Sequence, residues 1–341
     1  MFTFVVTCYQ QEEFIAMSLE SVKYQIQRYG QEQQFQLIVT DDGSKDSSCE
    51  VIRQWLEQNS ALFAQVDLLF NKENAGICRV YVDALRRVEG EQFLVLNGDD
   101  LLSPYNVFEL AGHLEEYDIV APAFLRFVGS GQFLTDPHIY LEVVLQRFIT
   151  GKKLYYAARL GCPIMGIALY RKSLLTEEVF AYILRFRTVN DRACFQKILE
   201  QQKNVSTYYS NRPSVLYRMS PSSLSNMKSP SRILHDKEIA QMCRFQRETE
   251  KSHIFRLLLL WQEKSTVFRH NPNRYIRMLR FLSPYFLLML WLYIRHPRQL
   301  RAMERELVDQ HLQDCADHYQ AIQAQTFRLS HPISKNPDEK G

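Results

Sequence analysis

Two short acidic segments are the clearest candidates for chemistry in this chain. Asp41-Asp42-Gly43-Ser44 and Asn97-Gly98-Asp99-Asp100 each follow a run of apolar residues directly. Adjacent carboxylates repel one another unless a cation lies beside them, and Mg²⁺ is typically held by one or two carboxylates together with substrate phosphates. The second segment therefore indicates a site for a metal and a diphosphate, and the first could accept hydrogen bonds from a nucleobase or a ribose. Both segments could also be plain solvated turns, since Asp, Gly and Ser favour turns.

The segments around these residues predict an α/β fold. Short apolar runs at residues 2–6, 35–40, 66–70, 93–96 and 119–121 are expected to be buried strands, and 13–28, 48–58, 77–88 and 106–114 are expected to be helices. Alternating strands and helices imply a parallel sheet with helices on both faces. In such sheets ligands bind outside the carboxyl ends of the strands, which is where both acidic segments lie.

The motifs, taken in order, resemble those of family 2 glycosyltransferases with the GT-A fold. Residues 5–12 resemble the family's first strand and the loop after it, with Gln10 where asparagine is usual, and Ser21 and Gln25 match the helix that follows. Four further segments match: Asp41 to Ser44 without change, Asn74-Ala75-Gly76 followed by Arg79, Asn97 to Asp100 with Pro104, and Asn190-Asp191. The family's closing element resembles Tyr217-Arg218 followed by Ser223 and Ser225, with Ser220 here in place of histidine. In the family's metal motif, Asn97 replaces the first aspartate.

This resemblance covers about residues 1–230 and implies a function. It implies a GT-A (Rossmann-like), mostly parallel sheet and the inverting transfer of a single sugar from a nucleotide-diphosphate sugar, usually a UDP-sugar. Asp191 would be the catalytic base, and Asp99 and Asp100 would hold Mg²⁺ or Mn²⁺. The residues expected at the donor nucleotide are Thr7, Tyr9, Asp41, Asp42, Asn74, Gly76, Arg79, Asn97 and Arg218.

The remaining third of the chain, 231–341, is expected to form a helical region with a flexible tail from about residue 328. Residues 281–294 are almost wholly apolar, and arginines but no acidic residues lie between Arg269 and Arg301. This pattern suits a helix lying at an anionic membrane surface, and we expect such contact through 270–305. The apolar run could also be a core helix that packs on the catalytic domain, with its arginines solvated. Its 14 residues are fewer than the roughly 18 that a spanning helix needs.

The composition excludes several other classes of function. A net charge of +3 over 341 residues does not favour nucleic-acid binding, and no GxGxxG or Walker loop follows an expected strand, as dehydrogenases and nucleotidyltransferases would need. Seven scattered cysteines without a CxxC pair indicate reduced thiols and a cytoplasmic protein, and the first residues are expected to form a strand rather than a secretory signal.

Absent and altered motifs bear on the acceptor and on catalytic competence. The Gln-x-x-Arg-Trp motif of processive synthases is absent, so a glycan or lipid-linked oligosaccharide acceptor at the cytoplasmic face of the membrane is expected, in cell-surface polysaccharide synthesis. The alternative is a non-catalytic module that binds a sugar nucleotide or a partner protein. The departures at Asn97 and Ser220 favour this alternative, and the retention of Asp99, Asp100 and Asp191 opposes it.

Overall fold

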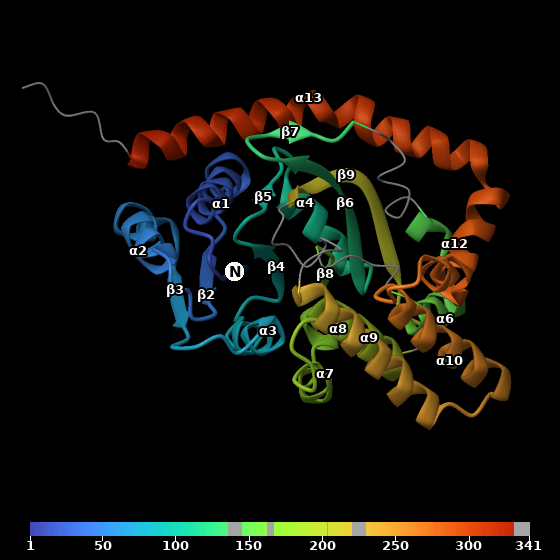
Figure 1. Ribbon diagram of the computed structural model, residues 1–341. Helices are drawn as coiled ribbons and strands as arrows, with labels where there is room; N and C mark the ends of the chain where they lie inside the picture. Colours follow the sequence, from blue (N-terminus) through green and yellow to red (C-terminus); the bar gives the residue numbers. More distant parts are fainter. Residues whose placement is uncertain (136–144, 162–166, 203, 220–229, 331–341) are drawn as a thin grey trace, which may run out of the picture.

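The computed structural model describes residues 1–135, 145–161, 167–202, 204–219 and 230–330 (Figure 1). Its main sheet holds four parallel strands in the order β3-β2-β1-β4: β1 (Phe2–Cys8), β2 (Phe35–Asp41), β3 (Gln65–Phe70) and β4 (Gln92–Asn97). The helices between them are α1 (Ile15–Tyr29), α2 (Ser48–Asn59) with the 3₁₀ turn η1 (Ser60–Leu62), and α3 (Ile77–Leu85). The predicted α/β class and its first four strands are confirmed, and α3 ends three residues earlier than expected.

Both faces of this sheet are buried, as the alternation of side chains along a strand requires. In β1, Phe4 and Val6 point into one core with residues of α1 and α2, whereas Val5 points into a second core with residues of α3. All seven residues of β1 are buried. Parallel strands that are covered on both faces have continuous apolar sequences, which is why residues 2–6 could be recognised as a strand.

A second, mixed sheet continues the fold beyond β4. The long strands β6 (Ile119–Val128) and β9 (Thr207–Met219) pair in parallel, and β5 (Leu101–Leu102), β7 (Gln132–Phe133) and β8 (Leu169–Tyr170) add antiparallel to them. The strand expected at 119–121 is confirmed as the start of β6, which is longer than expected because it pairs with β9, far along the chain. The helix expected at 106–114 is the shorter α4 (Val107–Gly112), followed by the 3₁₀ turn η2 (His113–Glu115).

Helices fill most of the described chain between β7 and β9. These elements are η4 (Gln146–Phe148), α6 (Lys152–Leu160), η5 (Lys172–Leu174), α7 (Glu177–Ile183) and α8 (Asn190–Gln201). Helix α8 carries Asp191 in its first turn. Residues 162–166, with Gly166, and residues 220–229 lie outside the described residues.

The C-terminal region is helical, as predicted. It contains α9 (Pro230–Thr249), α10 (His253–Phe268), α11 (Arg274–Met278), the 3₁₀ helix η6 (Leu279–Leu282), α12 (Pro284–Arg295) and α13 (Pro297–Ser330). Helix α13 runs along the molecule beside β7 and α1 (Figure 1) and buries Leu307, Cys315 and Tyr319 in the same core as Phe4. It continues to Ser330, so residues 328–330 of the expected tail are helical, and the rest of the expected tail lies outside the described residues.

Candidate active site

A hydrogen-bonded network lies where β1 and β4 end. Asp100 is 1% exposed, and its carboxylate accepts hydrogen bonds from the backbone N–H of Arg218 (2.8 Å) and from Asn97 Nδ2 (3.1 Å). Asn97 Oδ1 in turn accepts a hydrogen bond from Thr7 Oγ1 (3.3 Å). The pairing of β1 with β4 and of β5 with β9 thus brings together four residues that are up to 211 positions apart in sequence: Thr7, Asn97, Asp100 and Arg218.

The electrostatics of this network favour a cation. Burial raises the pKa of Asp99, and burial together with the neighbouring charge of Asp99 raises the pKa of Asp100 well above its usual range. A buried carboxylate next to a half-buried one is costly to keep ionised unless positive charge is supplied. The guanidinium of Arg218 supplies part of this positive charge and so opposes the rise in the pKa of both carboxyls.

The side chain of Arg218 is held in one position by several contacts. Its Nε donates to the carbonyl of Asp99 (2.9 Å) and its Nη1 to the carbonyl of Gly129 (3.0 Å). The guanidinium lies over the rings of Phe14 (4.3 Å) and Phe127 (4.6 Å). Its Nη2 is buried without a hydrogen-bond partner in the described part of the chain. A buried donor without a partner is rare in folded proteins, so this nitrogen is suited to a phosphate oxygen.

The network fits a divalent metal through Asp99 rather than through both carboxylates equally. No group of three or more His, Cys, Asp or Glu side chains able to hold a metal occurs among the described residues. Both oxygens of Asp100 are engaged by protein donors, which leaves the Asp99 carboxylate as the available ligand. One carboxylate together with substrate phosphates is an ordinary ligand set for Mg²⁺, so the residues present fit a metal that binds along with a diphosphate.

A second group of predicted residues lies at the end of β2, next to β1 in the sheet. Asp41 accepts hydrogen bonds from the backbone N–H (2.8 Å) and the hydroxyl (2.5 Å) of Ser44. Asp42 accepts from the N–H groups of Ala75 (2.7 Å) and Gly76 (2.8 Å) and from Asn71 Nδ2 (3.2 Å). Asp42 therefore fixes the loop 71–76. Tyr9 is 42% exposed just after β1, where its ring is open to a nucleobase.

Gly76 and Asn74 are tied to an arginine that the sequence did not single out. Gly76 has φ +93°, and a Cβ added there would lie 2.3 Å from Arg187 Cγ. The Nη2 of Arg187 donates to both the carbonyl (2.7 Å) and the side-chain oxygen of Asn74. Arg79, by contrast, is 58% exposed by its side chain and pairs with Asp83 one turn along α3 (2.6 Å). This pair accounts for Arg79 as a surface charge and does not join it to the carboxylate network.

Asp191 lies in the first turn of α8, where its Oδ1 accepts from the backbone N–H of Arg192 (2.6 Å). The loop just before it is anchored by Glu238 of α9. The Glu238 carboxylate accepts from the backbone N–H of Arg187 (2.7 Å), the backbone N–H of Thr188 (2.8 Å) and the Thr188 hydroxyl (2.6 Å). Arg187 and Glu238 thus connect the loop 71–76, Asp191 and the C-terminal helices. Neither belongs to a motif, so no sequence signal pointed to them.

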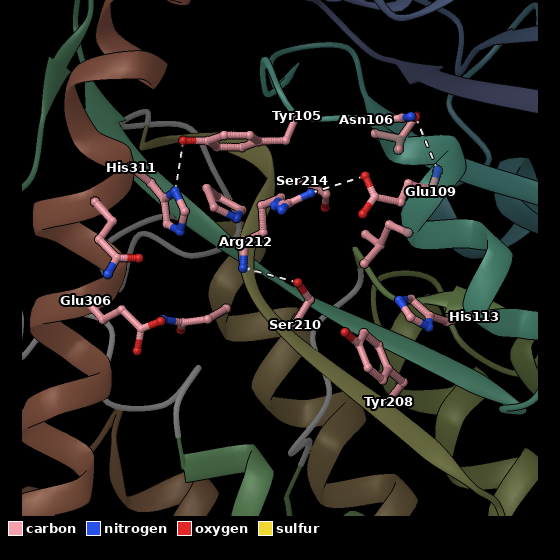
Figure 2. Close-up of a pocket in the computed structure, with 15 residues that line it drawn as sticks. Tyr105, Asn106, Glu109, His113, Tyr208, Ser210, Arg212, Ser214, Glu306 and His311 are labelled. Carbon is pink, nitrogen blue, oxygen red and sulfur yellow. Dashed lines mark hydrogen bonds and ion pairs between the residues drawn. The ribbon is translucent and has the colours of Figure 1, made fainter. Parts of the chain in front are cut away.

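A cavity of about 300 Å³ lies elsewhere, between α4, the middle of β9 and α13 (Figure 2). Its labelled side chains include Tyr105, Glu109, Arg212 and His311, and Arg212 pairs with Glu109 across it (3.2 Å). None of the residues predicted to bind donor or metal lines this cavity. It is therefore separate from the carboxylate network. Ser220, Ser223 and Ser225 of the closing motif lie outside the described residues.

Comparison with known proteins agrees with this arrangement. Residues 3–178 match the model of glycosyl transferase family 2. The chain belongs to this family. A stretch of 144 residues of this glycosyltransferase is 34% identical to a teichoic acid poly(glycerol phosphate) polymerase of Staphylococcus epidermidis, covering 41% of the chain and only 18% of that relative.

Solved structures share the fold of this glycosyltransferase. TarS 1-349 of S. aureus in complex with UDP-GlcNAc superposes with a TM-score of 0.56 at 15% identity, covering 96% of this chain and 92% of that one. The mannosyltransferase PcManGT of Pyrobaculum calidifontis, in complex with GDP-Man and Mn²⁺, gives 0.52 at 16% identity, covering 96% and 85%. At these identities the likeness establishes the GT-A fold, which confirms the fold class expected from the sequence.

Proposed function

We propose that this glycosyltransferase transfers a single hexosyl or N-acetylhexosaminyl residue, with inversion, from a nucleotide-diphosphate sugar to a glycan or lipid-linked oligosaccharide. The donor is expected to be a UDP-sugar, and the product to enter a cell-surface polysaccharide or cell-wall polymer. The similarity to a teichoic acid polymerase and the complex of TarS with UDP-GlcNAc support this substrate class.

One observation carries the proposal: the hydrogen-bonded network of Asp99, Asp100, Asn97 and Arg218 at the carboxyl end of β4, in which Asp100 and Arg218 are buried. It combines a carboxylate available to a metal with a guanidinium nitrogen available to a phosphate. Tyr9, which follows the neighbouring strand β1 and is 42% exposed, would contact the nucleoside. Asp41 and Asp42, at the end of β2, are 1% and 4% exposed and hydrogen-bonded within the protein, so they would shape that site through Ser44 and the loop 71–76. This edge of the sheet is where ligands bind in open α/β folds.

In the proposed reaction, Asp191 takes the proton from the acceptor hydroxyl while the hydroxyl oxygen attacks the anomeric carbon. The bond from that carbon to the acceptor oxygen forms, the bond to the phosphate oxygen breaks, and the nucleoside diphosphate leaves with the bonding electrons. Arg218 would hold the departing phosphate. A divalent metal at Asp99 would supply Lewis-acid stabilisation of the leaving diphosphate. Asp100 would fix the Arg218 backbone through its hydrogen bond.

The donor site can be tested without knowing the acceptor. We would titrate the protein calorimetrically with UDP, GDP, dTDP and CMP, each with and without Mn²⁺. We expect one nucleoside diphosphate to bind in a metal-dependent way, and Asp99→Ala to abolish this binding. Asp309→Ala, which removes an exposed carboxylate of α13, is the matched control and should bind as the wild type does. If no nucleotide binds under any condition, the donor site proposed here is wrong.

Asp191→Asn distinguishes a catalyst from a binding module. In a catalyst this variant should release nucleoside diphosphate from the sugar donor at least about 100-fold more slowly, since general acid–base groups contribute 10²–10⁴-fold, and it should keep its affinity for the donor. A protein that binds the nucleotide sugar but shows no turnover in either form, across acceptors of the proposed class, would be a binding module instead.

A further inference from the structure

The C-terminal helices present a large apolar surface to solvent. One face of α12 packs on the core through Leu292 and its neighbours. The other face carries large apolar side chains that are 40–67% exposed, namely Phe286, Leu287, Leu290, Trp291 and Ile294. The core-helix interpretation of residues 281–294 therefore accounts for only one side of the helix.

This apolar surface extends to elements that the sequence had not associated with it. In α10, Ile254 is 75% exposed and Leu257 is 66% exposed. Trp261 of α10 donates its indole N–H to the carbonyl of Leu282 in η6 (2.8 Å), and the ring of Phe281 lies 5.3 Å from that of Phe286. Helices α10, η6 and α12 thus adjoin one another. Soluble monomers rarely expose contiguous apolar patches of this kind unless the patch binds something.

The charges around the apolar surface are positive. The sequence contains no acidic residue between Arg269 and Arg301, and Arg274, Arg295, Arg298 and Arg301 are exposed. None of these four arginines forms an ion pair within the described part of the chain. The acidic residue of α10, Glu263, is buried and paired with Arg244 and Arg247. A two-fold contact between copies through this surface would bring arginines against arginines, whereas an anionic surface complements them.

We propose that helices α10–α12 bind the surface of an anionic lipid bilayer, with the apolar side chains entering the boundary between headgroups and acyl chains and the arginines contacting lipid phosphates. No single helix in the described ranges is long and apolar enough to cross a bilayer. Two consecutive helical segments together would be long and apolar enough, but they are bent by 58° relative to each other: Arg274–Leu282 and Pro284–Arg295. A bent, basic and one-sided apolar segment suits a position in the plane of the interface. This inference goes beyond sugar transfer and does not depend on it.

The test is flotation of the full chain with vesicles of phosphatidylcholine alone or mixed with phosphatidylglycerol. We expect the wild type to float with the mixed vesicles and to be released as salt screens the charges. Trp291→Glu with Ile294→Glu should lower binding at least about tenfold, because it places charge where acyl chains would lie. Arg295→Ser with Arg298→Ser should lower it roughly fivefold per arginine. Leu68→Glu, at a leucine of β3 that is 40% exposed, is the control and should bind as the wild type does.

Several outcomes would overturn the proposal. These are absence of binding to the mixed vesicles, equal binding to both vesicle types at all salt concentrations, or equal binding by the Trp291/Ile294 variant. A concentration-dependent dimer in sedimentation that this variant converts to monomer, without vesicle binding by the wild type, would assign the surface to a second copy. Flotation requires no turnover, so failure of the proposed sugar transfer would leave this result standing.

Discussion

Replacement of Glu238 by alanine tests the connection between the C-terminal helices and the proposed base. The carboxylate is buried and accepts three hydrogen bonds, two from backbone N–H groups of Arg187 and Thr188 and one from the Thr188 hydroxyl. A buried donor left without a partner costs about 1–3 kcal/mol. These bonds are only partly buried, so water would replace some of them. We therefore expect a loss of about 2–4 kcal/mol in the free energy of unfolding.

The measurement is urea unfolding followed by circular dichroism, with Glu248→Ala as the matched control. Glu248 lies on the same helix α9 but is exposed, and such surface changes usually shift stability by no more than about 0.5 kcal/mol. The variant should also turn over at least about tenfold more slowly, because the loop it anchors leads into Asp191 and small misplacements of a catalytic group are costly. Affinity for the nucleoside diphosphate should fall less than turnover does, because Asp99 and Arg218 lie on other elements and only the contact of Arg187 with Asn74 would be loosened.

Two results would refute this reasoning. If Glu238→Ala destabilises the protein no more than Glu248→Ala does, the three hydrogen bonds do not hold the 187–188 loop as described. If stability falls but turnover per folded molecule is unchanged, the loop does not position Asp191. Glu238→Gln keeps the length of the side chain and one acceptor oxygen, so it should lie between alanine and wild type in both measurements.

Three further substitutions follow from the structure. Gly76→Ala should lower stability by at least about 1–2 kcal/mol and weaken donor binding, because φ is +93° and the new Cβ would displace Arg187; unchanged urea midpoint and calorimetric affinity would contradict this. Asp100 has a folded pKa raised above its unfolded value by burial and by Asp99, so its carboxyl stabilises the fold below about pH 4 and loses this contribution as the pH rises. In metal-free thermal melts, the stability of Asp100→Asn relative to wild type should therefore increase from pH 4 to pH 8, and a constant difference would be inconsistent with a raised pKa. Burial lowers the pKa of His318 to about 4, so the wild type should lose roughly 3 kcal/mol as the pH falls from about 6.5 to about 4; His318→Gln should not show this loss in urea titrations across that range.

The sequence by itself determined the fold class and the positions of the acidic motifs. Residues 2–6, 35–40 and 93–96 are mostly apolar because both faces of the main sheet are buried, and this requirement is local enough to be recognised in the sequence. Asp41, Asp42, Asp99 and Asp100 follow strands β2 and β4 directly, so their place at the carboxyl edge of the sheet was predictable. Helix α12 begins with a serine–proline pair typical of helix starts, and the hydroxyl of Ser283 accepts a hydrogen bond from the N–H of Phe286.

Only the tertiary structure decided how these residues are used. Pairing of β6 with β9, and of β5 with β9, brings Arg218 to Asp100 across 118 positions of sequence, and no local pattern specifies such a partner. Arg187 contacts the loop 71–76 and Glu238 contacts the loop before Asp191, both through long-range hydrogen bonds. The local sequence gives no signal for such contacts. The joint exposure of α10 and α12 could not be predicted for the same reason. The sequence of an apolar helix does not show whether its second face packs on a core or contacts solvent. Burial is a property of the assembled fold, and the sequence alone could not say which face of these helices would remain uncovered.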